Sequence, residues 1–125
     1  MRLLLDTHVY LWYLADAPEL SSEARRLIRD ADRVYVSAAS VWEAAIKVAI
    51  GKLEVDLTGM VEGIRASGFD ELPVLARHAA QLSALAPHHR DPFDRLLIAQ
   101  AVQEPLALVT HDPALAGYPA RVEMV

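Results

Sequence analysis

The chain begins with the stretch RLLLDTHVY, Arg2 to Tyr10, in which a short apolar run ends in a carboxylate. A continuous apolar run such as Leu3–Leu5 is typical of a strand that is covered on both faces of a sheet. The residues from about Val9 to Ala15 then follow a helical pattern. A buried strand that runs directly into a helix is the repeating unit of a parallel α/β sheet.

The same unit recurs along the rest of the chain. Strands are predicted at Arg33–Ser37 and Leu106–Asp112, with shorter extended pieces near Phe69–Leu72 and in the C-terminal RVEMV. Helices are predicted over five further ranges, several of them with a serine, proline or glycine at one end: Leu20–Ala31, Ser40–Gly51, Leu57–Ala66, Val74–Leu85 and Pro92–Glu104. This alternation indicates one α/β domain over residues 1–125, with a mainly parallel central sheet flanked by helices.

Composition narrows the class of protein. Of the 125 residues 54% are hydrophobic and none is cysteine, which excludes disulfides and thiolate metal sites and favours a cytoplasmic location. No apolar run reaches the roughly 18 residues of a membrane span. Asp6 also ends the first apolar run before it could form a secretory signal. The net charge of −5 argues against a nucleic-acid partner, unless several acids share one metal-neutralised site.

Acidic residues follow the predicted strands at the point where each strand ends. Asp6 follows the first strand, Glu43 lies one helical turn into the helix after the second, and Asp112 follows the third. Asp94 lies in the first turn of the helix that starts at Pro92, where the helix dipole favours an anion. Because the carboxyl ends of parallel strands share one edge of a sheet, we expect these four carboxylates to meet there.

A cluster of this kind requires positive charge. Two carboxylates about 4 Å apart repel by roughly 4 kcal/mol at an effective dielectric constant of about 20, and no cationic partner is evident near these acids in sequence. Oxygen ligands with few histidines favour Mg²⁺ or Mn²⁺ over zinc. Such a site can activate water for attack on a phosphodiester, which makes a nuclease the physical hypothesis.

Four stretches resemble the PIN-domain ribonucleases, and more closely the VapC toxins of bacterial type II toxin–antitoxin pairs. They are LLLDTHVYLWYL, VSAASVWEAAIK, HRDPFDRLLIAQA and LVTHDPAL, in the family's order and spacing from about Leu3 to Leu115. The resemblance implies a three-layer PIN-like fold and a Mg²⁺- or Mn²⁺-dependent endoribonuclease. It places the catalytic, metal-binding acidic quartet on Asp6, Glu43, Asp94 and Asp112. Residues Gly51–Leu75 carry no family signature.

The resemblance also implies partners. These are an RNA substrate and a VapB-like antitoxin. An arginine of the antitoxin could compete with the metal for the carboxylate oxygens of the quartet. We also expect a homodimer, because the high apolar content predicts hydrophobic surface to be covered. The helices near the N-terminus, rich in Ala, Leu and Trp, are the expected place for both contacts.

Asp91 and Asp94 differ in their expected roles. Pro92 suits the first helical position, so Asp91 falls at the N-cap and Asp94 at the third helical position, facing the sheet edge. We therefore expect Asp91 to cap the helix, with a supporting role behind the metal ligands as the alternative. Asp94 is then the ligand.

Other candidates have two interpretations each. The hydroxyls of Thr110 and Ser37 are expected to support the carboxylates, although a turn explains Thr110 nearly as well. Glu43 also fits a capping box in which it binds the Ser40 amide. Arg95 either contacts RNA or pairs with an acid.

The spacings of the remaining histidines match no metal-binding signature, and the remaining arginines have two possible roles. His88, His89 and Arg90 are expected to form a solvated loop, with a phosphate contact as the alternative. Arginines 25, 26, 29 and 33 are expected to form a solvated helix face, with an RNA-binding edge as the alternative.

Three other functions share part of this pattern. A receiver-like phosphoacceptor domain would need adjacent acids after the first strand and a lysine after a late strand, but the lysines are Lys47 and Lys52. A haloacid-dehalogenase-like phosphatase would need an acid where His8 stands. A catalytically silent binding module on the same fold remains the alternative, although the intact quartet argues against it.

Overall fold

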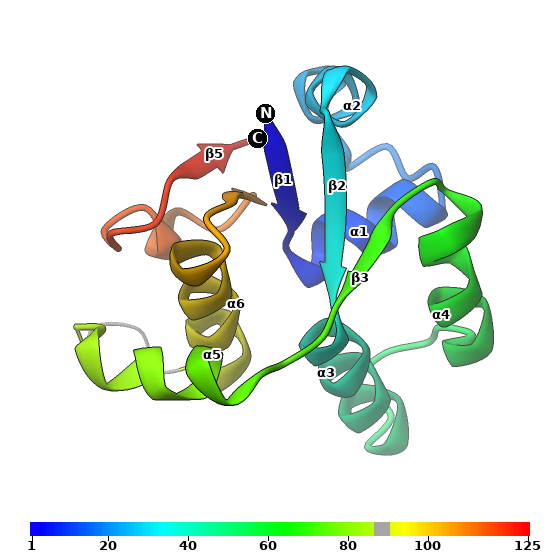
Figure 1. The fold of residues 1–125 in the computed structure, drawn as a ribbon. Helices are drawn as coiled ribbons and strands as arrows, with labels where there is room; N and C mark the ends of the chain where they lie inside the picture. The colour runs from blue at the N-terminus through cyan, green and yellow to red at the C-terminus, as the bar shows by residue number, and fades with distance from the viewer. Residues whose placement is uncertain (87–90) are drawn as a thin grey trace.

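The computed structural model describes residues 1–86 and 91–125 and is built on a parallel β-sheet (Figure 1). The described residues form a five-stranded sheet in the order β3-β2-β1-β4-β5. The strands are β1 (Arg2–Leu5), β2 (Arg33–Ser37), β3 (Asp70–Leu72), β4 (Ala107–Thr110) and β5 (Val122–Met124). All pairings between these strands are parallel, which confirms the predicted sheet and its C-terminal edge strand.

Strand β1 lies in the middle of the sheet and is paired on both sides. Leu5 lies opposite Val36 of β2 and opposite Val109 of β4. The backbone N–H of Asp6 donates to the Val109 carbonyl at 2.9 Å, which extends the β1–β4 pairing by one residue. The residues that end or follow these three strands therefore lie in one row at the carboxyl edge of the sheet: Asp6, Ser37 and Thr110.

Helices cover both faces of the sheet. Leu3 and Leu5 pack with residues of α1 (Thr7–Leu14), α2 (Ser22–Asp30) and α4 (Leu57–Ala66). Leu4 faces the opposite way and packs with α6 (Pro92–Gln103). Figure 1 shows α5 and α6 on one side of the sheet and α1 and α4 on the other. The predicted three-layer α/β fold is confirmed, and no helix in the described ranges is long and apolar enough to span a membrane.

Helix α3 (Ala38–Ala49) begins two residues earlier than predicted. The Ser37 hydroxyl accepts a hydrogen bond from the Ala39 N–H at 3.0 Å, so the last residue of β2 is also the helix cap. The predicted capping box at Ser40 is therefore wrong, because Ser40 lies inside the helix. At the other end Gly51, with a φ of 74°, ends the helix as predicted.

The predicted helix Val74–Leu85 is two shorter pieces, α5 (Ala76–Gln81) and a 3₁₀ turn (Leu82–Ala84). The start of α5 is fixed by buried His78, whose Nδ1 accepts the Leu75 N–H at 2.9 Å. Because Nδ1 is the acceptor, Nε2 carries the proton and donates to Glu104 Oε2 at 2.5 Å. This contact ties α5 to the C-terminal end of α6.

Glu104→Gln is expected to reduce the acid sensitivity of folding. The His78 hydrogen bond holds the pKa of Glu104 below its ordinary value, and Arg77, at 2.8 Å, acts in the same direction. A carboxylate whose pKa is lowered in the folded state stabilises the fold above its unfolded pKa, about 4.3 for glutamate, and loses this contribution as pH falls through the folded value.

Denaturant unfolding at about pH 7 and about pH 3 measures this effect. Glu104→Gln should be clearly less stable than wild type near neutral pH and closer to it in acid. Glu62→Gln, which changes an exposed glutamate of α4, is the control and should follow wild type at both values. An equal loss for Glu104→Gln at both pH values would contradict the prediction.

Candidate active site

Asp6 and the Asp112 loop meet at the Thr110 hydroxyl, where β1 and β4 end. Thr110 Oγ1 donates to Asp6 Oδ2 at 2.7 Å and accepts the Asp112 N–H at 3.1 Å. Thr110 is fully buried and Asp6 is 7% exposed. The structure thus connects two members of the predicted quartet through one buried hydroxyl, at the sheet edge where the strand pattern predicted them.

Asp6 is a buried carboxylate whose charge is only partly compensated. Burial raises the pKa of Asp6, and the nearby charge of Glu43 acts in the same direction. The Thr110 hydrogen bond and the charge of His8 lower the pKa without cancelling the effect of burial. An additional cation near Asp6 would therefore stabilise the ionised form.

Glu43 is buried in α3 with both of its carboxylate oxygens engaged. Oε1 lies 2.9 Å from the Thr7 hydroxyl, which is itself 2.8 Å from the Ser40 hydroxyl. Oε2 accepts a hydrogen bond from Lys47 Nζ at 2.7 Å. The expectation that the acids lack a nearby cationic partner is therefore wrong. The signal was the i,i+4 spacing of Glu43 and Lys47, which places both side chains on one helix face.

Asp91 caps α6 as predicted. Its Oδ1 accepts the N–H groups of Phe93 and Asp94 at 2.9 and 3.2 Å, and Pro92 occupies the start of the helix. Trp42 of α3 packs edge-on against Phe93, with ring centroids 4.9 Å apart. This contact brings the first turn of α6, which carries half-buried Asp94, against the helix that carries Glu43.

The other predicted residues have defined positions. The Asp112 carboxylate accepts the Ala114 N–H at 2.9 Å and starts a short 3₁₀ turn, Pro113–Leu115. Ser37 is buried and caps α3. In the described part of the chain, the Arg95 guanidinium donates to the carbonyls of Ala86 and Leu82 at 2.8 and 3.3 Å and pairs with no acid there.

Three of the four arginines of the basic run pair with acids. Arg25 pairs with Asp16 and Arg33 with Asp70, at 2.5 and 3.0 Å, while Arg29 contacts its neighbour Asp30. These ion pairs favour the solvated surface over an RNA-binding edge, although Arg33 lies in β2 and not on the predicted helix face. The predicted loop at His88, His89 and Arg90 lies outside the described residues.

The donors present at this edge fit a hard cation by their chemistry. They are carboxylate and hydroxyl oxygens, which suit Mg²⁺ or Mn²⁺ better than zinc. Within residues 1–86 and 91–125, however, no three carboxylate or imidazole side chains converge closely enough to hold a metal ion. The ion pair between Glu43 and Lys47 occupies one side of the cluster.

Comparison with known proteins identifies the family to which this chain belongs. Residues 3–120 match the PIN domain family. Over 122 residues the chain is 35% identical to ribonuclease VapC22 of Mycobacterium tuberculosis (strain ATCC 25618 / H37Rv), covering 92% of this chain and 90% of that protein. The chain therefore belongs to the PIN-domain family and, within it, to the VapC-type ribonucleases.

Solved structures share the fold. One is VapBC2 from Rickettsia felis bound to a DNA fragment from their promoter, with a TM-score of 0.75, 16% identity, and coverage of 100% of this chain and 99% of that chain. Another is DNA-bound VapBC from Salmonella typhimurium, with a TM-score of 0.71, 14% identity, and coverage of 99% and 98%. These likenesses confirm the PIN-like three-layer architecture.

Asp91→Ala is expected to destabilise the protein by about 1 kcal/mol, because two α6 amides lose their acceptor. Asp91→Asn should lose much less, since asparagine caps helices nearly as well. Asp94→Asn, two residues after Pro92 in the same turn, leaves the Asp91 cap in place and should lose less stability than Asp91→Ala. Urea unfolding of the three variants measures these differences. Equal stability of Asp91→Ala and Asp91→Asn would show that the cap contributes nothing.

Proposed function

We propose that the protein is a metal-dependent endoribonuclease of the cytoplasm, the toxin of a VapBC-type toxin–antitoxin pair, with the acidic quartet as its active site. The observation that carries the proposal is the buried Thr110 hydroxyl at the carboxyl edge of the sheet, which donates to the Asp6 carboxylate and accepts the backbone N–H of Asp112. Glu43 and Asp94 lie on the two helices that pack together beside it. The relatives support this activity, since VapC22 is a ribonuclease by name and the structural neighbours include toxin–antitoxin complexes.

The residues at this site have three roles: holding the metal, orienting the carboxylates and fixing the start of α6. Asp6, Glu43, Asp94 and Asp112 would hold the metal. Thr110 orients Asp6 through Oδ2 and Thr7 orients Glu43 through Oε1, so both buried carboxylates keep one position. Asp91 fixes the first turn of α6 and thereby the backbone of Asp94. When bound, Mg²⁺ or Mn²⁺ supplies the Lewis acidity that lowers the pKa of an attacking water and offsets the phosphate charge.

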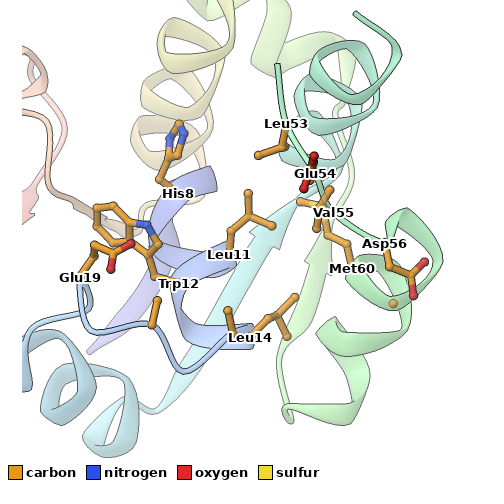
Figure 2. A pocket seen from close by; sticks show the side chains of 13 residues that line it. His8, Leu11, Trp12, Leu14, Glu19, Leu53, Glu54, Val55, Asp56 and Met60 are labelled. Atoms are coloured by element: carbon orange, nitrogen blue, oxygen red, sulfur yellow. The ribbon is translucent and has the colours of Figure 1, made fainter. Parts of the chain in front are cut away.

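An apolar groove supports the antitoxin part of the proposal. It has a volume of about 530 Å³ and lies between α1 and residues 53–60 (Figure 2). Leu11, Trp12 and Leu14 line the α1 side. Three acids also line the groove: Glu19, Glu54 and Asp56. This combination suits a partner segment with apolar anchors and basic flanking residues, and we assign the groove to a VapB-like antitoxin.

The outer face of α3 supports a homodimer. Trp42, Ile46 and Ile50 lie one turn apart and are 59%, 40% and 60% exposed, with Ala45 and Ala49 between them. A surface helix normally carries polar residues on its outer face, whereas this face is uncharged. Two copies can pair through it about a twofold axis without placing like charges together, and we assign the dimer contact to it.

RNA cleavage tests the enzymatic proposal. The purified chain should cleave RNA in Mg²⁺ or Mn²⁺, leave a 5′-phosphate and a 3′-hydroxyl, and lose the activity in excess EDTA. Asp94→Asn should lose cleavage because the quartet loses a ligand, while Asp91→Asn should keep most of it because the cap survives. Undiminished cleavage in EDTA would reject the metal dependence. If Asp91→Asn is as inactive as Asp94→Asn, the assignment of Asp91 as the helix cap and Asp94 as the metal ligand is wrong.

Light scattering after size exclusion tests the two surfaces together. The chain alone should have the mass of a dimer, and the product of the neighbouring reading frame should bind it and suppress cleavage. Leu14→Asp, in the groove, should weaken partner binding and keep the dimer. Ile46→Asp, on α3, should give a monomer that still binds the partner, with Val61→Asp on α4 as the exposed control outside both surfaces. A monomeric wild type unaffected by the neighbour would reject the toxin assignment.

A further inference from the structure

Three aromatic rings gather near the ends of β1 and β4. The ring centroid of Trp12, in α1, lies 6.4 Å from that of His8 and 5.7 Å from that of His111. Both histidines are exposed, whereas Trp12 is half-buried and packs against the core. These residues, here called the three-ring cluster, form an aromatic surface that solvent reaches.

Backbone contacts hold the rings of the cluster in place. Nδ1 of His111 lies 2.6 Å from the backbone oxygen of Val125, and because that oxygen only accepts, Nδ1 carries the proton and donates it. The carbonyl of Trp12 accepts the N–H of Ala17 at 2.9 Å, just beyond the end of α1. A ligand that stacks on rings already fixed in this way does not have to order them, which lowers the cost of binding.

The three-ring cluster adjoins the candidate active site. His8 lies in the first turn of α1, for which Asp6 is the N-cap residue. His111 follows Thr110, whose hydroxyl donates to the Asp6 carboxylate. Figure 2 shows His8 and Trp12 together at one end of the groove. An RNA chain that reaches Asp6 would therefore lie beside the three rings.

The charge of the protein favours contact with RNA through the bases. The net charge is −5, and three of the four arginines of the basic run are engaged in ion pairs. Affinity gained by neutralising phosphates requires free cationic side chains. Stacking of an unpaired base on an aromatic or histidine ring does not depend on the net charge of the protein, and every base has a π-face.

We propose that the three-ring cluster is a nucleobase-binding site, in which a base close to the cleaved bond stacks on Trp12 against the flanking histidine rings. The inference rests on the proposed function, since it names residues that hold the RNA substrate of that site. Among the described residues, His8 and Trp12 also line the groove assigned to the antitoxin, whereas His111 does not. A bound antitoxin would therefore cover part of the base site.

Fluorescence of Trp12 reports on stacking directly. The chain has two tryptophans, so Trp42→Phe leaves Trp12 as the only one. A further Asp94→Asn change keeps the RNA intact in Mg²⁺. We expect a short, unstructured RNA oligonucleotide to quench the Trp12 emission, because a base lies on the ring. An oligonucleotide of the same length with abasic sites throughout should bind more weakly and leave the emission unchanged.

Anisotropy of a labelled RNA oligonucleotide measures the affinities of further variants in the Asp94→Asn background. Trp12→Ala should weaken binding roughly 5- to 150-fold, the effect of losing one stacked base. His111→Ala should weaken it several-fold, while Trp12→Phe and His111→Phe keep a ring and should remain close to the parent. Val61→Ala, which truncates an exposed side chain of α4, is the control and should bind as the parent does.

Binding of the antitoxin separates a loss of the base contact from a loss of the fold. His111→Ala should still bind the product of the neighbouring reading frame, because His111 lies outside the residues that line the groove. Unchanged RNA affinity of both Trp12→Ala and His111→Ala, or equal affinity for the base-bearing and abasic oligonucleotides, would overturn the inference. In either case, metal-dependent RNA cleavage by wild type would leave the proposed function intact. If wild type neither binds nor cleaves RNA, both fall together.

Discussion

The register of β1 between β2 and β4 is the constraint on which the site depends. Parallel pairing sets Leu5 beside both Val36 and Val109, and the residues one step further along each strand must then share one edge. Side chains alternate along a strand, so a shift of one residue would turn Asp6 into the core and bring Leu5 to the edge. The full burial of Leu3, Leu4 and Leu5 on both faces opposes such a shift. The same apolar packing that stabilises the sheet therefore fixes the positions of the acids.

Burying several acids at one edge is costly, and the fold offsets the cost with three different kinds of partner. Asp6 uses a hydroxyl of the neighbouring strand, Thr110. Glu43 uses a lysine one turn away on its own helix. Asp91 and Asp112 use backbone amides at the starts of α6 and the following 3₁₀ turn, where free N–H groups point out of the helix end. Burial still raises the pKa of Asp6 despite the Thr110 hydrogen bond, so an additional cation nearby would stabilise its ionised form.

Local patterns predicted the strands, the α6 cap and the sheet edge, because each depends on short-range spacing and on a rule that all parallel sheets obey. The Asp91–Pro92 pair predicted the start of α6, because aspartate is favoured at the N-cap and proline at the first helical position. The start of α3 could not be predicted in the same way, since Ser37 and Ser40 are both good caps and the length of β2 decides between them. The shortened α5 depends on a contact between His78 and Glu104, 26 positions apart, which no local pattern contains. The ion pair of Glu43 with Lys47, in contrast, follows from an i,i+4 spacing that the sequence alone contains.

The groove and the acidic edge are joined through Trp12. Its ring lies 6.4 Å from that of His8 and 5.7 Å from that of His111, and these histidines stand next to the quartet, two residues after Asp6 and one before Asp112. Figure 2 shows His8 and Trp12 together at one end of the groove, with Leu14 away from them. A basic side chain of a bound partner near Trp12 would therefore act on Asp6 through its charge, as His8 already does. Apolar anchors near Leu14 would supply affinity without contacting the quartet. Binding and inhibition by such a partner would thus depend on different parts of the same groove.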